Sequence, residues 1–158
     1  MIRIGQGYDI HRFTAGRPLI LGGYEVQEAL RGLLGHSDAD ALVHAVIDAI
    51  LGAMAVGDIG KWFPDTDEQW RGASGKQLME TIRLALHING WHIVNVDSTV
   101  ITQEPKLAPH IFEIRKSLAS LLNVKIECVS VKAKTKEGLD AVGAGEALEA
   151  QAVVLLEN

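Results

Sequence analysis

The 158 residues are enough for one domain that buries its own hydrophobic core. Hydrophobic residues make up 47% and charged residues 22%, as in globular proteins, and the net charge of −5 excludes a broad basic surface for nucleic acid or anionic membranes. Cys128 is the single cysteine, which excludes an intrachain disulfide, and no signal peptide or membrane-spanning stretch is recognisable. We therefore expect a cytoplasmic protein with one domain over residues 1–158.

The first regular pattern is an alternation over residues 2–11, which predicts a β-strand. Ile2, Ile4, Tyr8 and Ile10 share the even positions, whereas Asp9 and His11 share the odd positions. We therefore expect Ile10 to point into the core and the two polar side chains to point away from it. Residues 17–26 are predicted to form two short strands around a glycine pair.

Three helices are predicted where apolar residues recur at helical spacing. The first follows a capping pattern at residues 37–40 and ends at Gly57, the second runs from Ser74 to Gly90, and the third follows Pro109. A polar loop is predicted at residues 58–72. Strands are predicted at residues 91–103, 126–135 and 147–156.

This order of elements predicts an α+β fold, a single domain in which helices pack on one face of a mixed β-sheet. The second face of the sheet must also be covered. Oligomerisation is one way to cover it, and the mass of the protein in solution tests that hypothesis.

Three side chains suggest a metal site. Asp9 and His11 share a strand face, and His44 lies on the first predicted helix with Asp48 one turn later. Two histidines and a carboxylate suit zinc with a fourth position open, and Asp48 could orient His44. The spacing alone leaves a solvated helix face as the alternative, because the three residues meet only if the fold brings them together.

Other residues suit phosphate chemistry. His36 and Ser37 stand near a helix N-terminus, where backbone N–H groups favour anions, although a simple cap has the same pattern. Residues 132–138 contain three lysines, a threonine and Glu137, which could hold phosphate oxygens and a hard cation or form an ordinary charged strand end. Residues 63–67 are either a plain turn or a loop that closes over a substrate.

Four stretches in order, "GYDIHRF", "GLLGHSDADALVHAVIDAILGAMAVGDIGKWFPDTD", "QEPKLAPHI" and "VKAKTKEGL", together resemble one family. It is the 2-C-methyl-D-erythritol 2,4-cyclodiphosphate synthase family of the methylerythritol phosphate pathway of isoprene biosynthesis. The resemblance covers essentially the whole chain. Its specificity lies in the combination of motifs, since no single one of them identifies the family.

The resemblance implies a metal-dependent phosphorus–oxygen lyase. In the family's reaction, the free phosphate of 4-diphosphocytidyl-2-C-methyl-D-erythritol 2-phosphate attacks the β-phosphorus, CMP leaves and a cyclic diphosphate forms. The resemblance also implies a homotrimer with active sites between its subunits, which would cover the second face of the sheet. A small-molecule cytidine diphosphate derivative is the implied substrate.

Site residues follow by position from the same resemblance. The implied metal ligands are Asp9, His11 and His44 for Zn²⁺, and Glu137 for Mg²⁺ or Mn²⁺ at the diphosphate. The implied catalytic residues are His36 and Thr135, which match positions that stabilise the transition state. The implied substrate contacts are Ser37, Asp58, Ile59, Gly60, Phe63, Pro64, Asp65, Thr66, Asp67, Thr102, Gln103, Glu104, Pro105, Lys106, Leu107, Ala108, Ala133, Lys134 and Lys136.

The sequence departs from the family pattern after the last motif. Lys134 and Lys136 replace hydroxyl or amide residues, and Ala141 and Ala144 replace a Phe and an Arg of a cavity on the trimer axis that can hold an isoprenoid diphosphate. Two alternative functions therefore stand beside the cyclase: a metal-dependent phosphodiesterase acting on a nucleotide diphosphate, and a non-catalytic trimeric nucleotide-binding protein.

Overall fold

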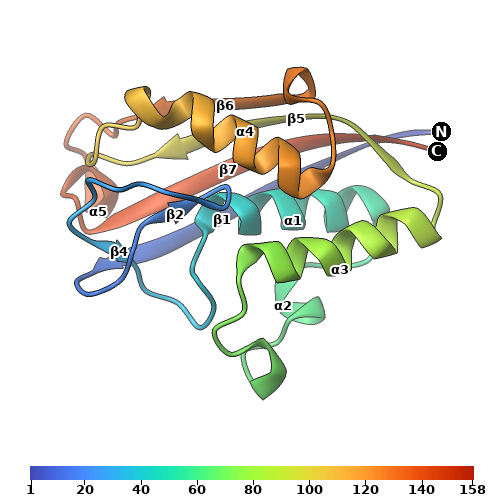
Figure 1. The fold of residues 1–158 in the computed structure, drawn as a ribbon, viewed down its shortest axis with the longest axis horizontal. Helices are drawn as coiled ribbons and strands as arrows, with labels where there is room; N and C mark the ends of the chain where they lie inside the picture. The colour runs from blue at the N-terminus through green and yellow to red at the C-terminus, as the bar shows by residue number, and fades with distance from the viewer.

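A five-stranded sheet forms the centre of the molecule in the computed structural model, which describes residues 1–158 (Figure 1). Its strand order is β4-β1-β7-β5-β6, with β5 and β6 parallel and the other neighbours antiparallel. The strands of this sheet are β1 (Ile2–Thr14), β4 (Gly32–Leu33), β5 (His92–Ile101), β6 (Val129–Lys134) and β7 (Ala147–Glu157). A separate hairpin joins β2 (Ile20–Leu21) and β3 (Tyr24–Glu25).

Three long helices cover one face of the sheet, as the sequence predicts (Figure 1). Helix α1 (Ala41–Met54) lies on β1 and β7, α4 (Ile111–Leu122) lies on β6, and α3 (Gly75–Ile88) packs against both helices. The short helices are α2 (Ile59–Trp62), η1 (Glu68–Trp70), η2 (Ala108–His110), η3 (Ile126–Cys128) and α5 (Asp140–Gly143). None of the helices combines the length and the apolar composition that crossing a membrane requires.

The short elements differ from the sequence predictions. Strand β4 and helix α5 were not expected, and the predicted loop over residues 58–72 contains α2 and η1. The predicted strand over residues 126–135 begins only at Val129, because η3 occupies its first residues. Elements of two to four residues are too short to establish a hydrophobic period. The β2–β3 hairpin was predicted because its glycine pair marks the turn, and the other short elements have no such signal.

Asp40 fixes the start of α1 and ties it to the β2–β3 hairpin. Its carboxylate accepts backbone N–H bonds from Val43 at 3.0 Å, Gly22 at 2.9 Å and Gly23 at 2.7 Å. Burial raises the pKa of Asp40 to about 6, although the three amides act in the opposite direction. The helix begins at Ala41, so His36 and Ser37 lie before the cap and not at the helix N-terminus where the sequence placed them.

Strand β1 faces α1 with its odd positions, contrary to the prediction for Ile10. A Cβ added to Gly5 or Gly7 would lie 1.9 Å from a carbonyl oxygen of α1, so strand and helix backbones are in direct contact there. Asp9 and His11 continue this face, whereas Ile10 lies on the opposite face and is 45% exposed. The predicted orientation of β1 was therefore wrong, because glycines occupy its core-facing side.

Large apolar side chains are exposed to solvent on the face of the sheet that the helices do not cover. Ile2 and Ile4 are each 70% exposed and Tyr8 is 44% exposed on β1, and Val153 is 39% exposed on β7. We refer to this surface, with Ile10, as the open sheet face. Contiguous exposed apolar residues of this kind mark an interaction surface.

Candidate metal centre and substrate cavity

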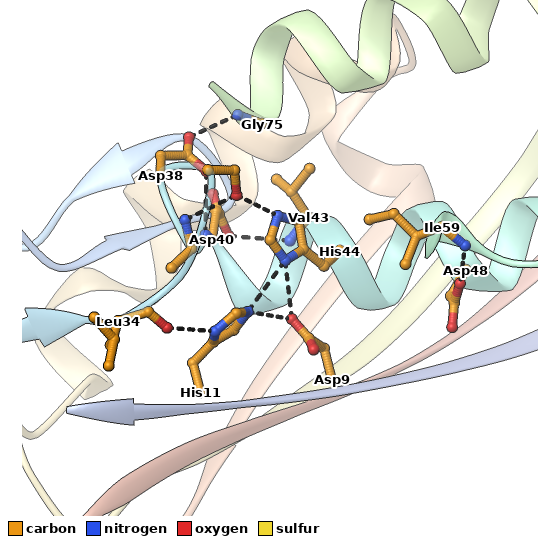
Figure 2. Close-up of polar contacts among 12 residues, drawn as sticks. Asp9, His11, Leu34, Asp38, Asp40, Val43, His44, Asp48, Ile59 and Gly75 are labelled. Carbon is orange, nitrogen blue, oxygen red and sulfur yellow. Dashed lines mark hydrogen bonds and ion pairs between the residues drawn. The ribbon is translucent and has the colours of Figure 1, made fainter. Parts of the chain in front are cut away.

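Asp9, His11 and His44 meet at the junction of β1 and α1 (Figure 2). Asp9 Oδ2 lies 2.9 Å from His11 Nε2 and 3.0 Å from His44 Nδ1, and the two ring nitrogens are 3.3 Å apart. Strand alternation puts the first two residues on one face, and the first turn of α1 presents His44 to them. The predicted trio is thus brought together.

This donor set fits a divalent metal. Bonds of about 2.0–2.1 Å in a tetrahedral zinc site separate neighbouring ligand atoms by about 3.3 Å, and the observed separations run from 2.9 to 3.3 Å. Three protein ligands leave a fourth position for water or a substrate oxygen, as in catalytic zinc sites. Asp9 and His11 are half-buried, so the centre is open on one side.

The outer nitrogen of each histidine has its own partner. His11 Nδ1 lies 2.8 Å from the carbonyl oxygen of Leu34, to which it can donate, and His44 Nε2 lies 3.2 Å from Ser37 Oγ. With a metal bound, these contacts would leave the lone pairs of His11 Nε2 and His44 Nδ1 free for the metal, whereas in the metal-free protein the same nitrogens face Asp9.

Asp48 does not orient His44, contrary to the prediction. Its carboxylate accepts the backbone N–H of Ile59 at 2.7 Å and so holds the start of α2, apart from the histidines (Figure 2). The side chain that contacts the outer nitrogen of His44 is Ser37.

The hydrogen bonds within the trio perturb its titration. Burial favours the neutral acid of Asp9, but hydrogen bonds from His11 and His44 outweigh it and lower the pKa of Asp9 to about 2. Burial likewise acts to lower the pKa of His11, but the hydrogen bond and charge of Asp9 raise the pKa above its usual value. Asp9 is thus ionised at neutral pH, and protonation of His11 competes with metal binding.

Zinc affinity is expected to depend on pH through His11. The pKa of His11 is raised, so protons begin to compete with zinc at a pH above the usual histidine pKa of about 6.5. As the pH falls below the pKa of His11, zinc affinity should decrease about tenfold per pH unit. The ion pair with Asp9 stabilises the metal-free protein below pH about 6.5, and this contribution is lost as pH rises through the pKa of folded His11. Calorimetric zinc titrations on both sides of neutrality measure the effect, and a flat profile would contradict it.

A cavity of about 300 Å³ opens beside the metal trio. Asp9, His11 and His44 line it themselves, and six further lining residues were predicted from the sequence, namely His36, Ser37, Ile59, Gly60, Phe63 and Asp65. Gly35, Trp70 and Leu78 were missed. Leu78 lies within the helix predicted from Ser74 to Gly90, where a buried leucine is an ordinary core residue, and Trp70 lies in the predicted polar loop.

Both polar and apolar residues line the cavity. Its apolar lining residues are Ile59, Phe63, Trp70 and Leu78, and the Trp70 ring meets Phe63 edge-on at 4.8 Å. Asp58 and Asp67 instead cap α2 and η1, where their side chains accept backbone N–H bonds. These caps hold the segment that carries Phe63 and Asp65 over the cavity.

The other predicted contacts gather elsewhere, at the ends of β5 and β6. The backbone N–H of Thr102 donates to the carbonyl of Lys134 at 2.9 Å, and Thr135 Oγ1 donates to Glu137 Oε1 at 2.8 Å. Lys136 pairs with Asp140 at 3.2 Å and with Glu149 at 3.3 Å. The residues of this second group are Thr102, Gln103, Glu104, Pro105, Lys106, Leu107, Ala108, Ala133, Lys134, Thr135, Lys136 and Glu137.

The second group does not line the metal cavity of its own chain. One chain therefore has two separate groups of side chains that could bind phosphate: the residues around the metal cavity and the second group. Pro64 and Thr66 also lie outside the lining of the cavity.

The fold and the site define the class of protein: an α+β protein whose Asp-His-His metal group opens onto a cavity sized for a small molecule. The sequence model of the YgbB family matches residues 2–157, and the chain belongs to that family.

Named relatives agree with this membership. The chain is 54% identical over 155 residues to the 2-C-methyl-D-erythritol 2,4-cyclodiphosphate synthase of Neisseria gonorrhoeae, covering 98% of this chain and 96% of the relative. The CDP complex of IspF from Plasmodium falciparum matches with a TM-score of 0.85 and 37% identity, covering 98% of this chain and 95% of the other. The bifunctional IspDF of Campylobacter jejuni matches with a TM-score of 0.89 and 35% identity over 99% of this chain, which spans 42% of that longer protein.

Proposed function

We infer that this protein is an enzyme that catalyses the reaction of its named relatives. It converts 4-diphosphocytidyl-2-C-methyl-D-erythritol 2-phosphate to 2-C-methyl-D-erythritol 2,4-cyclodiphosphate with release of CMP, a step of isoprenoid precursor synthesis. The observation that carries this inference is the Asp9, His11 and His44 group at the wall of a cavity, in a chain 54% identical to a named synthase.

We propose that Asp9, His11 and His44 hold zinc and that Glu137 helps to hold Mg²⁺ or Mn²⁺ at the diphosphate. When bound, such cations neutralise phosphate charge and polarise the bond to the leaving group. His36 lines the cavity, where its imidazole could donate a hydrogen bond to a phosphate oxygen. The nucleophile is a phosphate of the substrate itself, so the reaction needs no nucleophilic side chain.

The rest of the cavity positions the reacting groups. Asp65 can accept hydrogen bonds from the hydroxyl groups of the erythritol, while Phe63 and Trp70 offer an apolar surface to its carbon skeleton. A bent substrate held in this way keeps the attacking phosphate in line with the leaving CMP. The apolar lining residues would also keep water from competing with the phosphate nucleophile of the substrate.

We further propose that each complete site lies between two subunits of a homotrimer. The second group, at residues 102–108 and 133–137, would receive the cytidine part beside the metal cavity of a neighbouring chain. Two observations support this arrangement: the two groups are separate within one chain, and the open sheet face leaves Ile4 and Tyr8 in solvent.

Ile4→Glu is expected to dissociate the assembly. Ile4 is 70% exposed on the open sheet face, so a charge there would be buried without a partner once subunits pack on it. Sedimentation should report a single chain for the variant and a larger species for the wild type, with CMP release lost. Leu84→Glu, at a residue 59% exposed on α3, is the matched control and should keep the larger mass. An unchanged mass for Ile4→Glu would refute the proposed interface.

The activity is tested by incubating the purified protein with the cytidine substrate, with and without a chelator. We expect metal-dependent release of CMP and a cyclic diphosphate visible by phosphorus NMR. Linear phosphates would indicate the phosphodiesterase, and binding without CMP release would indicate a nucleotide-binding protein.

A further inference from the structure

One turn of the chain supplies the outer hydrogen bonds of both histidines in the metal trio. Leu34 provides the carbonyl that meets His11 Nδ1 at 2.8 Å, and Ser37 provides the hydroxyl that meets His44 Nε2 at 3.2 Å. We call residues 34–37 the ligand turn. Whatever fixes the ligand turn also fixes how the two rings face a metal.

Arg17 holds the ligand turn from outside. In its side chain, Nη1 donates to the carbonyl oxygen of Gly35 at 2.7 Å and Nη2 donates to that of Ser37 at 2.5 Å. The guanidinium thus bridges the two carbonyls on either side of His36. It is half-buried and forms no ion pair with a carboxylate, so its hydrogen-bonding capacity is directed at the turn.

Close packing leaves the ligand turn little freedom on its other side. A Cβ added to Gly35 would lie 3.1 Å from His11 Cε1 and 2.8 Å from the Cβ of Ala39, so the turn already touches the ligand ring. Gly32, two residues before the ligand turn, allows the backbone of Arg17 and Pro18 to approach, since a Cβ there would lie 2.1 Å from the Pro18 carbonyl oxygen and 2.5 Å from that of Arg17. The turn is therefore bounded by His11 on one side and by Arg17 on the other.

We propose that Arg17 is a positioning residue of the metal centre, because its guanidinium fixes the ligand turn and thereby orients His11 and His44. The proposal rests on the metal site of the proposed function. A planar guanidinium with two parallel N–H groups suits this task, since it constrains both carbonyls at once. Lysine, with a single ammonium, can hold one carbonyl at a time.

Arg17→Met is expected to weaken zinc binding about 10- to 100-fold, the range found when an outer partner of a metal ligand is removed. The measurement is zinc affinity of the metal-stripped protein, in competition with a chromophoric chelator and without substrate. Arg17→Lys should fall between Arg17→Met and the wild type. The melting temperatures of the metal-free proteins are recorded in parallel.

Arg115→Met is the matched control. Arg115 also donates to two backbone carbonyls, those of Val129 at 2.9 Å and Ile126 at 3.3 Å, but it lies on α4 away from the metal trio. Its loss should leave zinc affinity unchanged even if it lowers the melting temperature. An equal loss of affinity in both variants would show a general effect of destabilisation and overturn the role of Arg17.

The outcomes separate the proposal from the metal site itself. A wild-type protein that binds no zinc would reject the metal site, whereas wild-type affinity in Arg17→Met would reject only the role of Arg17. Should Arg17→Met fail to fold, Arg17→Lys decides the question, since undiminished zinc affinity in that variant would overturn the proposal.

Discussion

His44→Ala is expected to remove bound zinc and to slow CMP release on the order of a thousandfold. The buried imidazole is one of the three proposed ligands, and Asp9 and His11 alone would form a two-ligand site. Metal stabilisation of developing charge is worth several kcal/mol, and about 4 kcal/mol corresponds to a rate factor of about a thousand. Metal content by elemental analysis and CMP release under single-turnover conditions measure the two effects.

His92→Ala provides the comparison for His44→Ala. His92 is exposed at the start of β5 and contacts neither the trio nor its cavity, so its loss should change neither zinc content nor rate. Both variants should keep the mass of the wild-type assembly. Full zinc occupancy in His44→Ala would show that the ligand assignment is wrong.

The chemistry of the site was more predictable than its geometry. Residue types and strand alternation were enough to propose Asp9 and His11 as a pair, and helical spacing offered His44 as the third member. Only the fold could show that β1 and the first turn of α1 meet, because a contact 33 residues apart in sequence has no local signature. The α+β class and the long elements followed from hydrophobic periods, which need several turns or residues to establish themselves.

The outer partner of His44 shows why contacts between segments escape pattern analysis. Asp48 lies four residues after His44, a spacing that usually allows contact on a helix. Its carboxylate instead accepts a hydrogen bond from the backbone N–H of Ile59. Ser37 contacts His44 from the turn before the helix, and a contact between a turn and a helix has no periodic signature in the sequence. Trp70 was missed for a related reason, since its short helix η1 sits in a polar stretch.

The orientation of β1 was mispredicted for a physical reason that involves its glycines. Sequence patterns assign the core to the face with large apolar side chains, but Gly5 and Gly7 pack their backbones directly on α1. The apolar face of β1 is the one left exposed, with Ile4 and Ile10 in solvent. Both faces of β1 thus lack a continuous polar pattern, so alternation alone cannot tell the core-facing side from the exposed one.

Gly7→Ala is expected to destabilise the protein by more than about 3 kcal/mol, at the upper end for a single added methyl group. The new Cβ would lie 1.9 Å from the carbonyl oxygen of Ala45 and 2.7 Å from the backbone nitrogen of Ala49. Both neighbours are backbone atoms of α1, so no side chain can rotate aside and the strand must move. Because Gly7 lies two residues before Asp9, that movement should also separate Asp9 from His44 and weaken zinc binding.

Gly52→Ala is the matched substitution in the same helix–strand pair. The nearest atom to its added Cβ is the carbonyl oxygen of Gln6 at 3.8 Å, an ordinary contact, and alanine is favoured over glycine inside a helix by about 1 kcal/mol. Urea unfolding of the metal-free proteins should therefore move in opposite directions for the two variants. If Gly7→Ala unfolds at the same urea concentration as Gly52→Ala, then direct backbone packing of β1 on α1 is not what positions the metal ligands.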